Sequence, residues 1–387
     1  MLEQITHEEL EQDLLLNFNT NSPVYIQGGI GLGKSYTVRK VCKLYAERNG
    51  LQFREFSTMP NDIRNQVANG HGDISNKFIF FDIRAAGLDP SDIKGLPKLT
   101  GNYVEWIPDI VFKIASRKDF HGMLFFDEVN QAVPTVQSSL YQVILDNTAG
   151  SIKLSDNCLR CGAGNRTKDK SNVNKMSLAL SARFSNVELA VPSTTDWIER
   201  FARPNNVHRT VVSYLSYQQQ HLNIAPEDIK EQMNFANPRN WERLSKKLFE
   251  LDKLHSKKDD KYMKQLERLA IANIGGEAAM KFAAYCRLHD QVNHKEILEN
   301  PELITKLSID KQWFVLDMIV GEYEQKGSTK ENKLVNKIAG VMTHLKADLA
   351  VNTYKNCQQV NKLFPNQFKE SPKGVDWIME NMKYLMN

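Results

Sequence analysis

The sequence predicts an α/β protein in which helices flank a parallel sheet and an all-helical region follows. Three observations support that prediction. Short apolar segments alternate with helical patterns as far as Pro192, an arrangement typical of parallel sheets. Beyond Pro192 only helical patterns continue. The 387 residues are 41% hydrophobic and 25% charged, which excludes a mainly disordered or collagen-like chain.

The first elements surround a glycine-rich stretch. Thr6 and Glu9 form a capping-box pattern ahead of several leucines, which predicts a short amphipathic helix at the start of the chain. A helical run begins at Lys34 and extends to about Arg48, and Gly50 ends it. The other elements expected here are strands over residues 24–26, 52–57 and 77–83 and a helix over residues 61–69.

The later elements follow an insertion. Residues 90–112 contain turn-forming residues and are expected to form that insertion, with a hairpin. The next elements are expected to be strands over residues 123–126, 159–163 and 187–191 and a helix over residues 134–146. Apolar residues recur at helical spacing from Leu334 to Leu349, and again from Trp377 to Leu385, which predicts amphipathic helices.

Length and charge set broad limits. A chain of 387 residues suggests two or three domains. The net charge is +4, from 50 basic and 46 acidic residues, and so small a surplus neither requires nor excludes nucleic acid. The N-terminus lacks a signal-peptide layout and no apolar run approaches the length of a spanning helix, so we expect a cytoplasmic protein without a membrane partner.

The cysteines indicate a reducing compartment. There are five, which is a small and odd number. Cys158 and Cys161 form a C-x-x-C pair, but no second pair and no close histidine pair follows. Buried strand cysteines are therefore the favoured interpretation.

One segment carries recognisable chemistry. Residues 28–35 (GGIGLGKS) fit the pattern G-x-x-x-x-G-K-[ST], with an expected strand before it and a helix after it. Glycines allow backbone N–H groups to face phosphates, and the helix N-terminus adds its positive dipole end. Lys34 is placed to reach the β- and γ-phosphates of ATP, and Ser35 to ligate Mg²⁺. The candidate nucleotide-binding residues here are Gly28, Gly29, Ile30, Gly31, Leu32, Gly33, Lys34, Ser35 and Tyr36.

An acidic pair completes the expected site. A phosphate-binding loop of this kind works with acidic residues at the end of a separate strand, and Asp127 and Glu128 follow the strand expected over residues 123–126. Asp127 would hold Mg²⁺ directly or through water. Glu128 would orient and deprotonate the attacking water. The alternative is a strand that ends in a solvated acidic turn.

Further motifs resemble the AAA+ ATPases, and within them the MoxR-like branch with its chelatase-type relatives. Residues 90–95 (PSDIKG) are similar to the loop that precedes this branch's insertion, residues 162–166 (GAGNR) to the sensor-1 segment, and residues 178–184 (LALSARF) to the arginine-finger segment. The resemblance spans roughly residues 20–250. It implies an AAA+ core over residues 1–203, a helical lid over residues 204–294 and a helical extension over residues 295–387.

The resemblance also implies roles for single residues. Asn165 becomes the sensor-1 candidate, and a turn asparagine is the alternative. Arg183 becomes the arginine finger that reaches the ATP of a neighbouring subunit, and a surface salt bridge is the alternative. Arg239, in a segment similar to sensor 2, would contact the nucleotide from the same chain, although Pro238 also begins ordinary helices. The sequence departs from MoxR proteins at Arg166, where proline is common, and at Ala182, where aspartate is usual.

The resemblance implies a hexameric ring that remodels a protein partner, which often carries a von Willebrand factor A domain. The Asp-x-Ser-x-Ser run of that domain is absent from the sequence, so such a partner would be a separate chain. A nucleic-acid motor is a second hypothesis, with Lys94, Lys98 and Lys113 as contributors to a basic pore. The third hypothesis is a scaffold that binds nucleotide without hydrolysing it.

Overall fold

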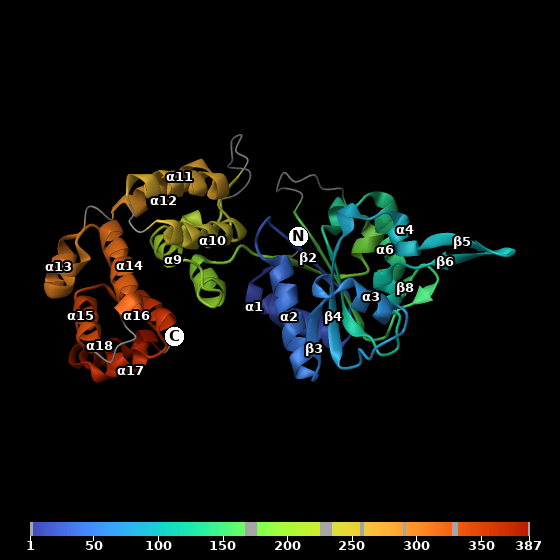
Figure 1. Cartoon of the computed structure of the whole chain (residues 1–387), viewed down its shortest axis with the longest axis horizontal. Helices are drawn as coiled ribbons and strands as arrows, with labels where there is room; N and C mark the ends of the chain where they lie inside the picture. The colour runs from blue at the N-terminus through green and yellow to red at the C-terminus, as the bar shows by residue number, and fades with distance from the viewer. Residues whose placement is uncertain are drawn as a thin grey trace. The chain divides into compact units, whose positions relative to one another are not determined.

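The computed structural model describes residues 3–166, 176–224, 234–255, 259–288, 292–326 and 332–385. The chain forms two compact units, the first ending at Pro192 and the second beginning at Ser193 (Figure 1). The first unit holds the sheet, and every element described in the second is helical. The predicted fold class is therefore confirmed: a parallel sheet flanked by helices, followed by a helical region.

Seven parallel strands form the sheet, in the order β1-β11-β2-β10-β7-β4-β3. The strands are β1 (Gln4–Ile5), β2 (Val24–Gly28), β3 (Gln52–Glu55), β4 (Lys77–Arg84), β7 (His121–Asp127), β10 (Cys158–Gly164) and β11 (Ser185–Leu189). Because all seven run the same way, the carboxyl ends of β2, β10, β7 and β4 meet at one edge, which is where α/β sheets bind ligands.

Alternate residues of the central strands enter opposite hydrophobic cores, as a sheet covered on both faces requires. In β7, Met123 and Phe125 pack with helices α1 (His7–Asn19) and α2 (Lys34–Arg48). Leu124 and Phe126 enter the other core. The helices on that second face are α3 (Asn61–Ala68), α5 (Ile110–Ala115), α6 (Pro134–Leu145) and α7 (Leu178–Ser181).

The local signals mostly predict these elements. The capping box of Thr6 and Glu9 is formed at the start of α1. The strand expected over residues 52–57 ends earlier, because residues 56–58 turn into a 3-10 helix. The loop expected over residues 90–95 is instead a short helix, α4 (Pro90–Lys94). Asp89 caps it by accepting a hydrogen bond from the Ser91 N–H, and Gly95 ends it with a φ of 92°.

The expected hairpin is formed by β5 (Leu96–Thr100) and β6 (Tyr103–Ile107) and projects from the first unit (Figure 1). The register pairs Pro97 with Trp106 and Leu99 with Val104. These four side chains therefore share one apolar face of the hairpin, which we call the apolar hairpin face. This face is exposed to solvent, since Leu99 is 77% exposed. A second, small hairpin that the sequence did not indicate joins β8 (Thr148–Ala149) and β9 (Ile152–Lys153).

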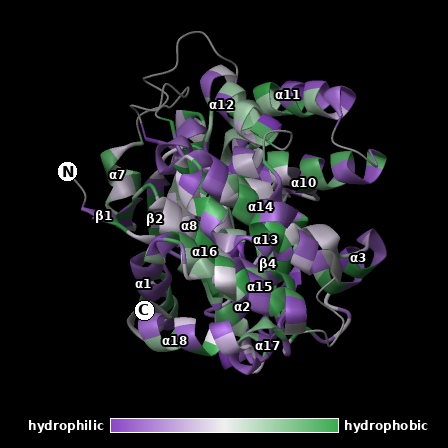
Figure 2. Ribbon diagram, turned by 90° about the vertical axis from the view of Figure 1, so that its left-hand side faces the viewer, coloured by the Kyte–Doolittle hydropathy of each residue, from purple (hydrophilic) through white to green (hydrophobic). Residues whose placement is uncertain are grey.

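The second unit has one continuous hydrophobic core that extends from Trp197 to Trp377. Hydrophilic and hydrophobic residues alternate along α11, as expected of an amphipathic helix with one buried face (Figure 2). The described helices are α8 (Thr194–Trp197), α9 (Arg209–Tyr217), α10 (Pro238–Leu254), α11 (Asp260–Ile274), α12 (Gly276–Cys286), α13 (His294–Glu299), α14 (Ile309–Lys326), α15 (Asn332–Met342), α16 (Ala347–Val360), α17 (Phe364–Glu370) and α18 (Pro372–Leu385).

The helical pattern from Leu334 to Leu349 corresponds to two helices and not to one continuous helix. Helix α15 ends at Met342 and α16 begins at Ala347. Residues on both sides of the break enter the same core. The predicted domain boundaries at residues 203 and 294 stay a prediction. Among the described helices, none has the length and apolar character needed to cross a membrane.

Candidate functional site

The glycine-rich loop lies between the end of β2 and the start of α2, at the carboxyl edge of the sheet. Gly31 and Gly33 have φ angles of 76° and 93°, a backbone region that disfavours residues with a Cβ. A Cβ on Gly29 would lie 2.9 Å from an Arg166 guanidinium nitrogen, closer than real Cβ contacts come. The turn of the loop thus needs glycines at positions 31 and 33.

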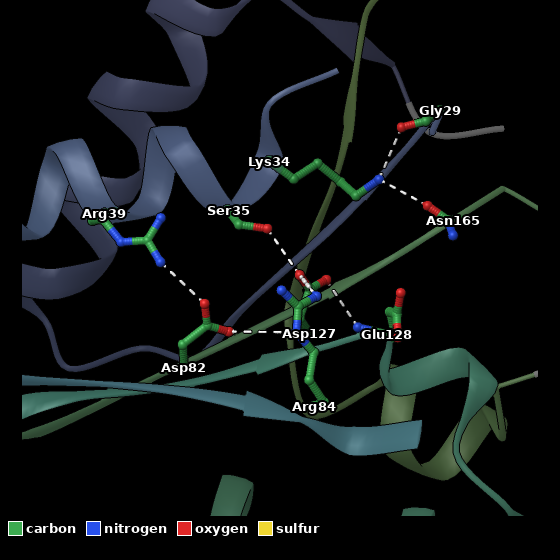
Figure 3. Close-up of polar contacts among 9 residues, drawn as sticks. All are labelled: Gly29, Lys34, Ser35, Arg39, Asp82, Arg84, Asp127, Glu128 and Asn165. Carbon is green, nitrogen blue, oxygen red and sulfur yellow. Dashed lines mark hydrogen bonds and ion pairs between the residues drawn. The ribbon is translucent and has the colours of Figure 1, made fainter. Parts of the chain in front are cut away.

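Lys34, in the first turn of α2, is held at the centre of the site. Its side chain is almost buried, with 8% exposed. The ammonium donates hydrogen bonds to the carbonyls of Gly28 (2.8 Å) and Gly29 (3.0 Å) and to Asn165 Oδ1 (3.0 Å). Figure 3 shows the bonds to Gly29 and Asn165. Lys34 and Asn165, which the sequence placed in different motifs, are therefore in direct contact.

Asp127 ends β7 and forms the second centre of the site. The residue as a whole is 6% exposed. The Ser35 hydroxyl donates to its Oδ2 at 2.8 Å, and the Glu128 backbone N–H donates to its Oδ1 at 2.9 Å (Figure 3). The two predicted metal ligands, Ser35 and Asp127, are therefore in direct contact. Their hydroxyl and carboxylate oxygens are donors that Mg²⁺ accepts, together with phosphate oxygens.

Two arginines and a second aspartate extend this centre at the end of β4. Arg84 Nη1 lies 2.6 Å from Asp127 Oδ2. Asp82 pairs with Arg39 at 3.0 Å and with Arg84 at 3.9 Å. Burial raises the pKa of Asp82, and the two arginines oppose that shift. The strand register places Arg84 directly opposite Asp127, a neighbour relation that sequence patterns did not indicate.

Glu128 has an unusual backbone conformation for its residue type. Its φ of 60° and ψ of 33° place it in the left-handed region, which costs a non-glycine residue about 1–2 kcal/mol. Among the described residues, no hydrogen bond or ion pair engages its carboxylate, and Figure 3 shows that group directed away from Asp127. Strain of this kind concentrates at functional sites, and here it accompanies a carboxylate without a described partner.

Asn130 holds the backbone of Asn165 by a hydrogen bond. Its side-chain amide donates to the Asn165 carbonyl at 2.6 Å. Gly164 leaves the room for this contact, because a Cβ there would lie 2.4 Å from Asn130 Oδ1. Sequence reasoning missed Asn130, although its place three residues after Asp127 on a strand-end turn was a usable signal.

The remaining predicted residues are Arg183, Tyr36 and Arg239. Arg183 packs over the ring of Tyr141, 4.9 Å from its centroid, and donates to the Ala179 carbonyl. Tyr36 is 38% exposed on α2. Arg239 is exposed in the first turn of α10, in the second unit. Their predicted roles stay predictions.

The cysteine interpretation agrees with the structure. All five cysteines are buried thiols. Burial raises the pKa of the Cys158 thiol to about 12, so this side chain stays protonated and unreactive near neutral pH. Within the described ranges, no group of three or more His, Cys, Asp or Glu side chains is arranged to hold a metal ion.

Comparisons with known proteins give weak likenesses. No family model and no curated protein matches the sequence. NtrX from Brucella abortus in complex with ADP is 15% identical over 75% of this chain and 67% of its own, with a TM-score of 0.36. A RuvB mutant from Thermotoga maritima is 14% identical over 79% of this chain and 78% of its own, with a TM-score of 0.33. Cdc6p from Pyrobaculum aerophilum is 10% identical over 94% of this chain and 86% of its own, with a TM-score of 0.40.

At such identities and TM-scores the likenesses carry no argument about this chain. Its fold rests on its own parallel sheet and helices, and the candidate site rests on its own contacts.

Proposed function

We propose that the chain is an ATP-hydrolysing AAA+ protein of the MoxR-like kind, which works in the cytoplasm as a hexameric ring. The observation that supports this most is a cluster of contacting side chains at the carboxyl edge of the sheet. Lys34 contacts Asn165, and Ser35 contacts Asp127, next to a glycine-rich loop that leads into a helix N-terminus. Each of these groups matches a need of nucleoside triphosphate hydrolysis.

Each side chain has a distinct part in the proposed reaction. Lys34 and the loop N–H groups bind the phosphates. Ser35 and Asp127 would hold Mg²⁺. When bound, this ion would neutralise negative charge on the phosphate oxygens. Glu128 accepts a proton from the attacking water, and Asn165 orients that water.

Two arginines would complete the site from elsewhere. Arg183 acts on the nucleotide of a neighbouring subunit, and Arg239 contacts the nucleotide of its own chain. Arg183 contacts Tyr141 and the Ala179 carbonyl of its own chain. A finger of this kind raises the hydrolysis rate by about 10³–10⁵.

A protein partner, on a separate chain that can include a von Willebrand factor A domain, is the proposed object of this activity. The apolar hairpin face favours it over nucleic acid, because exposed Leu99 and Val104 suit a protein surface better than phosphates. On the other face, Lys98 lies opposite Glu105, so this part of the hairpin offers a balanced pair and no basic stripe. The third hypothesis, a scaffold without turnover, does not explain the strained Glu128.

Nucleotide binding by the purified protein tests the proposal. A fluorescent ATP analogue should bind the wild type in the presence of Mg²⁺. Lys34→Met removes the ammonium and should weaken binding by about 100-fold, equivalent to two tenfold steps of about 1.4 kcal/mol each. Lys40→Met, on the same helix, removes an ammonium that pairs with Glu11 away from the loop and should leave binding unchanged. Equal binding by all three proteins would contradict the proposed site.

A further inference from the structure

We infer that Arg84 is a built-in competitor of the divalent cation: its guanidinium holds the Asp127 carboxylate until Mg²⁺ takes over that group. The inference rests on the proposed nucleotide site and concerns its regulation. It assigns a function to a residue that belongs to none of the motifs at the site.

The contacts of a single oxygen atom support this inference. Asp127 Oδ2 accepts from the Ser35 hydroxyl at 2.8 Å and from Arg84 Nη1 at 2.6 Å. The other carboxylate oxygen, Oδ1, accepts from the Glu128 backbone N–H at 2.9 Å. Ser35 Oγ and Asp127 Oδ2 are the two groups that would hold the metal, so Arg84 places positive charge beside the atom that a cation needs (Figure 3).

Burial explains why a cation is needed there. The Asp127 side chain is 8% exposed, and a buried carboxylate without a counter-charge is unfavourable. Arg84 supplies that counter-charge in the state described. When Mg²⁺ supplies it instead, the guanidinium loses its partner, because two cations cannot approach one carboxylate oxygen without repulsion.

Arg84 is also free to leave. Its side chain is 57% exposed, so the displaced guanidinium can return to water. Its other described partner, Asp82, lies at 3.9 Å and is already held by Arg39 at 3.0 Å. An arginine placed only to stabilise the fold would be expected to have more of its surface packed than this.

Metal binding without nucleotide provides the test. We would titrate nucleotide-free protein with Mn²⁺ as a probe for the Mg²⁺ site and follow free Mn²⁺ by electron paramagnetic resonance. A partly exposed arginine–carboxylate pair is worth about 1 kcal/mol, so Arg84→Gln should tighten Mn²⁺ binding about fivefold. Arg54→Gln makes the same charge change on exposed β3, where Arg54 contacts Gln52, and should leave the affinity unchanged. Asp127→Asn identifies the site by abolishing the binding.

The outcomes separate the inference from the proposed function. Unchanged or weaker Mn²⁺ binding by Arg84→Gln, with the melting curve of the wild type, would overturn the inference. An equal gain in Arg54→Gln would also overturn it, because general charge would then be the cause. Binding of a fluorescent ADP is measured on the same samples. If the wild type binds none, the proposed function fails while the Mn²⁺ comparison still decides the role of Arg84.

Discussion

Replacing Gly164 by alanine should damage both the stability of the first unit and its chemistry. A Cβ at this position would lie 2.1 Å from the Tyr25 hydroxyl and 2.4 Å from Asn130 Oδ1. Neither side chain has space to withdraw, because Tyr25 is 3% exposed and Asn130 is 4% exposed. One of these two side chains, or the strand itself, must therefore shift.

The size of the effect follows from these contacts. Overpacking of a buried site costs about 1–3 kcal/mol, and loss of the hydrogen bond from Asn130 to the Asn165 carbonyl adds about 1 kcal/mol. We therefore expect Gly164→Ala to lower the free energy of unfolding by about 2–4 kcal/mol. The displaced Asn130 also releases Asn165 from its place beside Lys34, so the ATP hydrolysis rate should fall as well.

Gly162→Ala is the matched control, two residues earlier on β10. Its new Cβ would meet Tyr25, Phe184 and Val129 at 3.1–3.3 Å, so small shifts can relieve the contact. Guanidinium unfolding followed by circular dichroism gives the two stabilities, and ATP turnover gives the two rates. Equal losses of stability in the two variants, or a normal turnover rate in Gly164→Ala, would show that the contact with Asn130 does not hold Asn165 in place.

Three further predictions concern other parts of the chain. Arg183→Ala should abolish ATP turnover and keep nucleotide affinity. If sites are shared between subunits, mixing this variant with Lys34→Ala should restore part of the ATPase activity. No restored activity would argue against an arginine finger that acts on a neighbouring subunit. Trp106→Ser, on the apolar hairpin face, should reduce turnover stimulated by a protein partner while unstimulated turnover stays constant; stimulation by DNA instead, with steep salt dependence, would favour the nucleic-acid motor. Burial lowers the pKa of His221, so near that pKa the unfolded chain binds more protons than the folded chain does. The free energy of unfolding should therefore fall as the pH drops below about 6.5. A free energy of unfolding that is independent of pH in that range would contradict this.

The sequence predicts the sheet and the loop because their signals are local. Residues 28–35 specify a phosphate-binding turn by their own glycines and lysine, and alternating strands and helices specify a parallel sheet. Asp127 and Glu128 were found in the same way, since they follow a buried apolar strand directly.

The sequence does not reveal relations that depend on which strands are neighbours. Arg84 meets Asp127 only because β4 lies beside β7 in that register, and no local pattern records strand order. The break between α15 and α16 was missed for a related reason. Apolar residues continue on both sides of residues 343–346 and enter one core, so their spacing alone resembles a longer helix.

The central claim is that Glu128 activates water for hydrolysis of bound ATP. Glu128→Gln preserves the size of the side chain and removes the base, so ATP binding should remain while Mg²⁺-dependent turnover falls by about 10²–10⁴. The direct measurement is the single-turnover hydrolysis rate of wild type and Glu128→Gln at saturating ATP, with binding measured in parallel. We expect intact binding with a rate lower by that factor. An equal rate in the two proteins would contradict it.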